Sequence, residues 1–167
     1  MRHTRIKKIS AYTLFGGLFL LFYFLQYTRL LPVFGHIAAA PFVPLTVLVA
    51  LQFKEWPAAL FGLVGGSLMD VMGTESACFY TITLFLLGCM AGLLVKYYVN
   101  SHLLSALALI ALFSLLFFAV KWATFYVGHP QAGNLLLWSL GSALYTTAVG
   151  VVIYFVLRLV FRRQEVK

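Results

Sequence analysis

The chain carries very little charge, and its central part carries almost none. Charged residues make up 10% and hydrophobic residues 63% of its 167 residues, whereas soluble domains contain about a quarter charged residues. This shortage excludes an ordinary soluble domain. The apolar segments also lack the alternation of apolar and polar residues that membrane β-barrels require. The composition therefore predicts an α-helical integral membrane protein.

Acidic residues are especially scarce. The chain has four Asp and Glu residues and twelve Lys and Arg residues, so its net charge is +8. Beside membrane spans, basic clusters set the orientation and attract anionic lipid, and no nucleic-acid recognition module accompanies them here. We therefore expect anionic lipid and no nucleic acid as a partner. The clusters lie at the two chain ends and comprise Arg2, Arg5, Lys7, Lys8, Arg158, Arg162, Arg163 and Lys167.

Short polar breaks divide the apolar region into segments, and a crossing helix needs about 20 apolar residues. The first segment is too long for the apolar core of a cleaved signal peptide, so we expect it to be retained. The second and third are short, and either cross a thinned bilayer or form a re-entrant hairpin; we favour two crossings. We predict one transmembrane domain over 10–161, between a basic segment 1–9 and a basic tail 162–167. The six segments cover 10–31, 38–53, 57–72, 76–95, 102–127 and 134–160.

The positions of the basic residues predict the orientation. If the N-terminus is cytoplasmic and the segments alternate, ten Lys and Arg lie inside, and Arg29 and Lys121 lie outside. This distribution obeys the positive-inside rule, and a re-entrant hairpin would leave the chain ends on the same side. We therefore expect about six crossings, with both termini in the cytoplasm. Aromatic residues suited to the two interfaces are Trp56, Tyr97 and Tyr98 inside, and Tyr27, Tyr126 and Trp138 outside.

Small residues recur every four positions in the third and fourth segments. In a membrane, this spacing lets two helix backbones approach closely. Such faces either pack the bundle internally or dock the transmembrane helix of a partner, and the two uses can coexist. The third segment contains Ala58, Gly62 and Gly66, with Asp70 at the same spacing, and the fourth contains Gly88 and Gly92.

Asp70 is the acidic residue expected within the membrane boundary. A carboxylate there is costly and needs a partner. Lys121 lies at comparable depth, and Arg29 is a second candidate, so the sequence predicts an intramembrane ion pair. A proton or ligand pathway and simple exposure at the outer interface are the alternatives. Glu75 follows five residues later, which is no recognised metal-ligand spacing, so we expect no metal.

Motifs for catalysis are absent. The sequence has no HExxH motif, no Gly-flanked nucleophilic serine and no Cys–His pattern. Cys78 and Cys89 are eleven residues apart on one predicted helix, about 16 Å by helical rise, which is too far for a disulfide. We expect no enzymatic activity and no cofactor.

Two stretches carry a family resemblance. GLVGGSLMD at 62–70 resembles the Gly-x-x-x-Gly-x-x-x-Asp signature of the rod shape-determining protein MreD family. LGCMAGLL at 87–94 resembles the family's Gly-x-x-Ala-Gly-Leu-Leu segment. The chain departs from the family where a Pro-Asp pair often opens the second helix, because it has Pro41-Phe42 and Pro44-Leu45 there.

The resemblance implies a non-catalytic subunit of the bacterial cell-elongation machinery in the inner membrane. Such a subunit would bind the single-span protein MreC and help couple MreB filaments to the peptidoglycan synthases. The implied fold is similar to that of the substrate-binding subunits of energy-coupling-factor vitamin transporters, which supply the alternative function. A vitamin-binding subunit would need an outward pocket, and the Ala-x-x-x-Ala-type motif that such subunits often carry is absent from 10–31. Assembly into a homo-oligomer stays open.

Overall fold

The structure, a computed structural model, describes residues 2–28, 37–53, 55–72, 78–98, 103–128 and 130–165. These ranges contain α-helices and no β-strand, so the predicted all-α fold is confirmed. The six helices are α1 (Arg2–Tyr27), α2 (Phe42–Phe53), α3 (Glu55–Met72), α4 (Phe79–Tyr98), α5 (Leu103–Phe125) and α6 (Ala132–Glu165).

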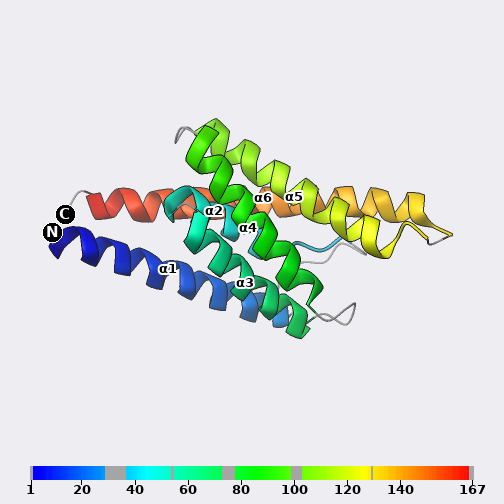
Figure 1. The fold of residues 1–167 in the computed structure, drawn as a ribbon, viewed down its shortest axis with the longest axis horizontal. Helices are drawn as coiled ribbons and strands as arrows, with labels where there is room; N and C mark the ends of the chain where they lie inside the picture. Colours follow the sequence, from blue (N-terminus) through cyan, green and yellow to red (C-terminus); the bar gives the residue numbers. More distant parts are fainter. Residues whose placement is uncertain are drawn as a thin grey trace.

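The helices run back and forth along the long axis of the molecule, and both chain ends lie at the same end (Figure 1). We call this the terminal end; α3 and α5 begin there, and α4 and α6 run towards it. The opposite end, where α4 and α6 begin, is the far end. The order of the helices therefore agrees with an alternating path that returns to the side on which it started.

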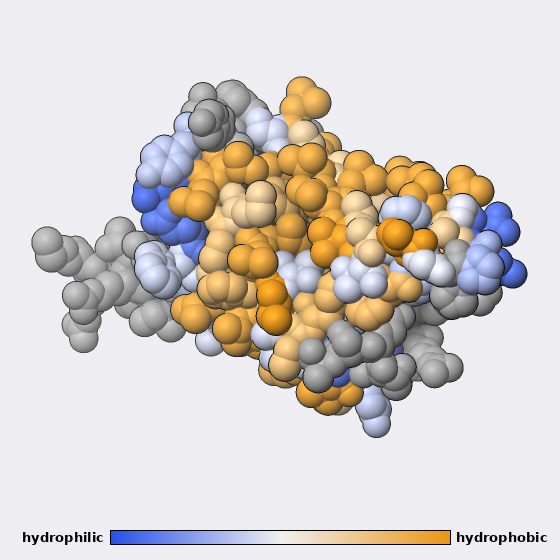
Figure 2. All heavy atoms as spheres, turned by 45° about the vertical axis from the view of Figure 1, so that its right-hand side comes forward, coloured by the Kyte–Doolittle hydropathy of each residue, from blue (hydrophilic) through white to orange (hydrophobic). Residues whose placement is uncertain are grey.

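Within the residues that the structure describes, three helices are long and apolar enough to cross a membrane, which indicates a membrane protein. Their apolar stretches are Phe79–Tyr97, Leu104–Phe125 and Ala132–Leu159. Tyr12–Tyr27 and Phe42–Phe53 are shorter apolar helices. Apolar side chains dominate the middle of the surface, and hydrophilic ones gather towards its two ends (Figure 2), as a lipid-embedded bundle requires.

The short helix α2 forms the centre of the bundle. Its residues 42–50 are all buried, and it contacts each of the other five helices. A helix that is apolar all round is expected to be surrounded by protein or lipid. Its 12 residues extend about 18 Å, which is less than the roughly 30 Å hydrocarbon core. The helical part of this segment alone therefore does not span a membrane.

The expected helix 38–53 is wrong in its first turn, because residues 38–40 lie outside any helix. Proline disfavours helical conformation in the residue before it, so Pro41 keeps Ala40 out of the helix. The backbone N–H of Ala38 donates to Oγ of Ser142 over 3.3 Å, and that of Ala40 donates to Oγ1 of Thr146 over 3.0 Å. Non-helical backbone at membrane depth is tolerated where protein groups satisfy it, and α6 supplies those groups.

Helices α1 and α6 differ from the expected segments mainly at their ends. α1 begins at Arg2, within the basic segment 1–9, and α6 continues to Glu165, within the basic tail 162–167. Lys and Arg are good helix formers, so these helices continue where the apolar runs stop. The expected end of the first segment near residue 31 lies outside the described residues.

Candidate functional site

The glycines of α3 touch the backbone of α4 directly. A Cβ atom added to Gly62 would lie 2.4 Å from the carbonyl oxygen of Leu84. At Gly66, the added atom would lie 2.4 Å from Cα of Thr81. Ordinary contacts between carbon atoms are about 3.5–4.0 Å, so neither position has room for even one methyl group.

The glycines of α4 make the reciprocal contacts. A Cβ atom at Gly88 would lie 2.5 Å from the carbonyl oxygen of Ala58, and one at Gly92 would lie 2.3 Å from Cα of Glu55. Ala58 is fully buried. The two antiparallel helices therefore approach along their whole shared length, as small residues at i and i+4 allow in membranes.

This arrangement is the internal-packing alternative for the small-residue faces. All four glycines meet the neighbouring helix of the same chain, so their Cα surfaces are occupied. A partner helix would have to bind to another surface.

Asp70 closes the far end of the same hairpin. The backbone N–H of Tyr80 donates to Oδ1 of Asp70 over 3.0 Å, and that of Thr81 donates to Oδ2 over 2.9 Å. The Thr81 hydroxyl also donates to Oδ2. These are N–H groups of the first turn of α4, which have no partner within their own helix. The carboxylate of α3 therefore acts as the N-cap of α4.

The local sequence explains why the cap comes from another helix. Cys78 precedes α4 and accepts the first helical hydrogen bond, from the N–H of Ile82 over 3.1 Å. It occupies the N-cap position, where Ser, Thr, Asp or Asn would ordinarily supply the capping oxygen. Its φ of 66° is left-handed, and its thiol is a weak acceptor. Asp70 supplies the missing oxygens and places its negative charge at the positive end of the α4 dipole.

The predicted ion pair of Asp70 with Lys121 does not occur among the described residues. The contacts of Asp70 are the three hydrogen bonds from the start of α4, which already satisfy its two oxygens. The Lys121 ammonium lies 5.6 Å from the ring centre of Tyr80. The sequence indicates that Lys121 and Asp70 lie at similar depth in the membrane. It does not indicate that the N-terminus of α4 lies beside the Asp70 carboxylate. Arg29 lies outside the described residues.

An ion pair closes the terminal end of the hairpin. Nζ of Lys96, in the last turn of α4, lies 2.9 Å from Oε1 of Glu55, in the first turn of α3. Both charges complement the dipole of their own helix. We did not expect this pair from the sequence, although an acid at the start of one helix and a base at the end of its antiparallel neighbour are a usable signal.

The basic residues at the chain ends are only partly described. Arg158 is exposed on α6. Of the other predicted lipid-binding residues, the structure describes the backbone, which α1 and α6 carry to the terminal end (Figure 1). Their side chains lie outside the described part; they are Arg2, Arg5, Lys7, Lys8, Arg162 and Arg163.

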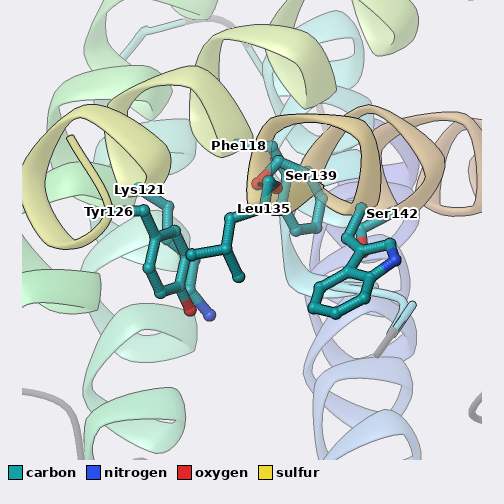
Figure 3. A pocket seen from close by; sticks show the side chains of 7 residues that line it. Phe118, Lys121, Tyr126, Leu135, Ser139 and Ser142 are labelled. Atoms are coloured by element: carbon teal, nitrogen blue, oxygen red, sulfur yellow. Dashed lines mark hydrogen bonds between the residues drawn. The ribbon is translucent and has the colours of Figure 1, made fainter. Parts of the chain in front are cut away.

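A cavity of about 260 Å³ lies at the far end between α5 and α6. Figure 3 shows Lys121 and Tyr126 on one side of it and Ser142 on the other. Sequence reasoning missed this cavity because it placed Tyr126 and Trp138 in the outer aromatic belt. The residues lining it are Phe118, Lys121, Tyr126, Leu135, Trp138, Ser139 and Ser142.

No group of three or more His, Cys, Asp or Glu that could hold a metal ion occurs in the described part of the chain. The geometric features that stand out are therefore the glycine-packed, capped hairpin and the cavity at the far end. Comparison with models of protein families, with curated proteins and with solved structures finds no match to this chain.

Proposed function

We propose that this chain is a non-catalytic scaffold subunit of the bacterial cell-elongation complex, which binds MreC and helps link MreB to peptidoglycan synthesis. The observation that supports the proposal is that the three residues of the MreD-like signature all contact α4. Gly62 and Gly66 bring α3 against α4, and Asp70 caps α4 from the same face. The three signature residues therefore all hold α3 and α4 together as a hairpin.

The proposed membrane topology follows from the same bundle. Six crossings place both termini in the cytoplasm, and the chain in the bacterial inner membrane. Residues 37–40 and α2 together make the second crossing. The shared position of the chain ends (Figure 1) and the basic residues near them support this orientation.

We propose that the partner helix binds along α1 and not along the glycine faces. Among the described residues, α1 contacts only α2 and α3, so it is the most peripheral helix. A Cβ atom at Gly16 or Gly17 would have nothing within 4 Å. Leu20 and Phe24, one and two turns further along, are more than half exposed. In membranes, a second helix can pack closely against glycines that have free space above them, next to exposed apolar side chains.

Affinity purification from mildly solubilised native membranes, followed by mass spectrometry, tests the proposal. Recovery of MreC and other elongation-complex proteins is the expected result. Gly17→Leu should lower the recovery of MreC without lowering the amount of folded protein. The control Gly16→Ala, a much smaller change on the same helix, should leave recovery nearly unchanged. If the wild-type protein recovers no elongation-complex protein, the scaffold proposal is wrong.

A second candidate function is the substrate-binding subunit of an energy-coupling-factor-type vitamin transporter. The specific observation in its favour is the cavity between α5 and α6, at the end opposite the chain termini. The same purification separates the two functions. Recovery of a transporter's membrane coupling subunit and paired ATPases, in place of MreC, would favour vitamin uptake.

A further inference from the structure

The cavity at the far end brings aromatic side chains and a buried hydroxyl group together. We propose that it binds a small molecule that has a single aromatic ring and a hydrogen-bond acceptor attached to that ring. This site is independent of the scaffold function, because the cavity lies between α5 and α6, whereas the proposed partner face lies on α1. A subunit that binds MreC could therefore carry the site, and so could one that does not.

The size of the cavity suits one ring. Its volume is about 260 Å³, and an apolar cavity of about 150 Å³ can already hold a benzene molecule. Two such rings would need about 300 Å³, which is more than the cavity offers. One ring with a short polar substituent therefore fills the space best.

Aromatic side chains enter the cavity from more than one element. Phe118 comes from α5, Trp138 comes from α6, and Tyr126 follows the end of α5. Aromatic rings attract one another in edge-to-face and offset-stacked arrangements, and each such pair contributes about two- to tenfold in affinity beyond the effect of the buried area. The wall therefore favours a flat aromatic ring over a saturated ring of the same size.

Ser142 supplies a hydrogen-bond donor in the same wall. It is 5% exposed and lines the cavity on the side opposite Tyr126 (Figure 3). Its Oγ accepts the backbone N–H of Ala38 over 3.3 Å, and a hydroxyl that accepts one hydrogen bond keeps its own hydrogen for donation. Ser139, in contrast, donates its hydrogen to the carbonyl of Leu135 in its own helix over 2.9 Å. The ligand group beside Ser142 is therefore an acceptor.

Ser142 also connects the cavity to the extended segment before α2. A ligand acceptor would complete a chain of hydrogen bonds that runs from the N–H of Ala38 through the Ser142 hydroxyl to the ligand. Hydrogen bonds in such a chain strengthen one another, so a bound ligand should hold Ala38 more firmly against α6. The N–H of Ala40 donates to Oγ1 of Thr146, one turn deeper in α6, and this bond lies outside the chain.

Binding measurements on the purified full-length chain test the site. The probe is benzamide, which has one aromatic ring and one carbonyl acceptor, and cyclohexanecarboxamide is its match without the aromatic ring. Ligand-observed NMR titrations in detergent micelles measure both affinities, and micelles without protein report the partition of each probe into detergent. Benzamide should bind about two- to tenfold more tightly than cyclohexanecarboxamide.

Two serine variants test the donor. Ser142→Ala removes it and should weaken the binding of benzamide by about two- to tenfold, the effect of one neutral hydrogen bond. Ser139→Ala is the matched control in the same wall and should leave the affinity nearly unchanged, because that hydroxyl bonds within its own helix. In the wild-type chain, benzamide should slow hydrogen exchange at Ala38 and leave exchange at Ala40 unchanged.

A further variant keeps the test valid if Ser142→Ala lowers the amount of folded protein. Ser139→Leu fills the cavity with apolar atoms and leaves Ser142 in place, so it should abolish the binding of benzamide. The proposed site is wrong if benzamide shows no saturable binding, or if the wild-type, Ser142→Ala and Ser139→Leu proteins bind it equally. The proposed ligand class is wrong if cyclohexanecarboxamide binds as tightly as benzamide.

Discussion

The molecule contains two antiparallel helix pairs that are packed in different ways. In α3–α4, four glycines bring backbone against backbone, and each end is closed by a polar contact, Asp70 at one and Glu55 at the other. Between α5 and α6, a cavity of about 260 Å³ remains at the far end. Helices α3 and α4 are in close backbone contact, whereas α5 and α6 leave unfilled space between them.

The difference has a simple physical origin. Glycine has no side chain, so two helices can meet without gaps, and the close contact supplies the dispersion energy that drives helix association in lipid. Between α5 and α6, the aromatic side chains of Phe118 and Trp138 line a cavity. The tight pair suits a structural role, and the looser pair leaves space at its far end. Substitutions that alter the packing or the polar contacts of the helices should therefore differ in their effect on stability.

The largest expected effect comes from adding a methyl group to the tight pair. In Gly66→Ala, the new atom would lie 2.4 Å from Cα of Thr81, so the helices must separate by more than about 1 Å to restore normal contact. We expect the free energy of unfolding to fall by about 3 kcal/mol, the upper part of the range for overpacking. Unfolding in mixed micelles, followed by circular dichroism, measures the loss.

Gly141→Ala is the matched control on α6. There the added atom would meet Cδ1 of Ile37 at 2.9 Å, the far end of a flexible side chain that can rotate away. We expect a loss below about 1 kcal/mol, under the usual range for overpacking. Equal losses at the two glycines would mean that the α3–α4 contact is looser than the structure shows.

The next effect concerns the cap from Asp70. Asp70→Asn keeps the shape but removes the charge and places an N–H₂ group where an acceptor is needed. We expect a loss of about 2 kcal/mol, at the upper end for an N-cap. Glu55→Gln at the other end of α3 is the control, and it should cost much less than Asp70→Asn, because an exposed ion pair contributes little to stability. Unfolding measurements on both variants compare the two ends; a larger loss for Glu55→Gln would contradict the capping role.

A smaller effect is expected where α6 supports the extended segment. Thr146→Val removes the acceptor for the N–H of Ala40 and leaves that buried group unpaired, which costs about 1–2 kcal/mol. Thr147→Val is the control, because its hydroxyl donates to the carbonyl of Ala143 in its own helix. We expect that control to change stability by less than about 0.5 kcal/mol. Hydrogen exchange at Ala40 offers a local readout and should become faster in Thr146→Val alone.

The smallest effect belongs to Ser114 on α5. Its hydroxyl is fully buried and has no hydrogen-bond partner in the described part of the chain. Ser114→Ala removes a polar group that has lost its water without gaining a partner. We expect stability to stay unchanged or to rise by up to about 1 kcal/mol. A clear loss in the unfolding measurement would show that the hydroxyl has a role that its contacts do not reveal.

Much of the architecture could be predicted from local sequence patterns. Uninterrupted apolar runs predicted the six helices, and the four-residue spacing of Gly62, Gly66, Gly88 and Gly92 predicted close helix packing. The start of α2 was predicted too early, although Pro41 signals the break, because a proline can equally well open a helix. The start of α1 and the end of α6 were misplaced because hydrophobicity predicts only the membrane-crossing part of a helix, and both helices extend beyond that part.

The class of this protein follows from its composition, because a shortage of charge and long apolar runs make lipid the suitable solvent for the chain. The sequence also determined which helices carry glycine faces. The tertiary structure decided what those features contact. It assigned Asp70 to the N-terminus of α4 in place of Lys121, and it paired the extended residues before α2 with the hydroxyls of Ser142 and Thr146. These contacts join residues far apart in the chain, and only the packing of the helices brings their atoms within hydrogen-bonding distance.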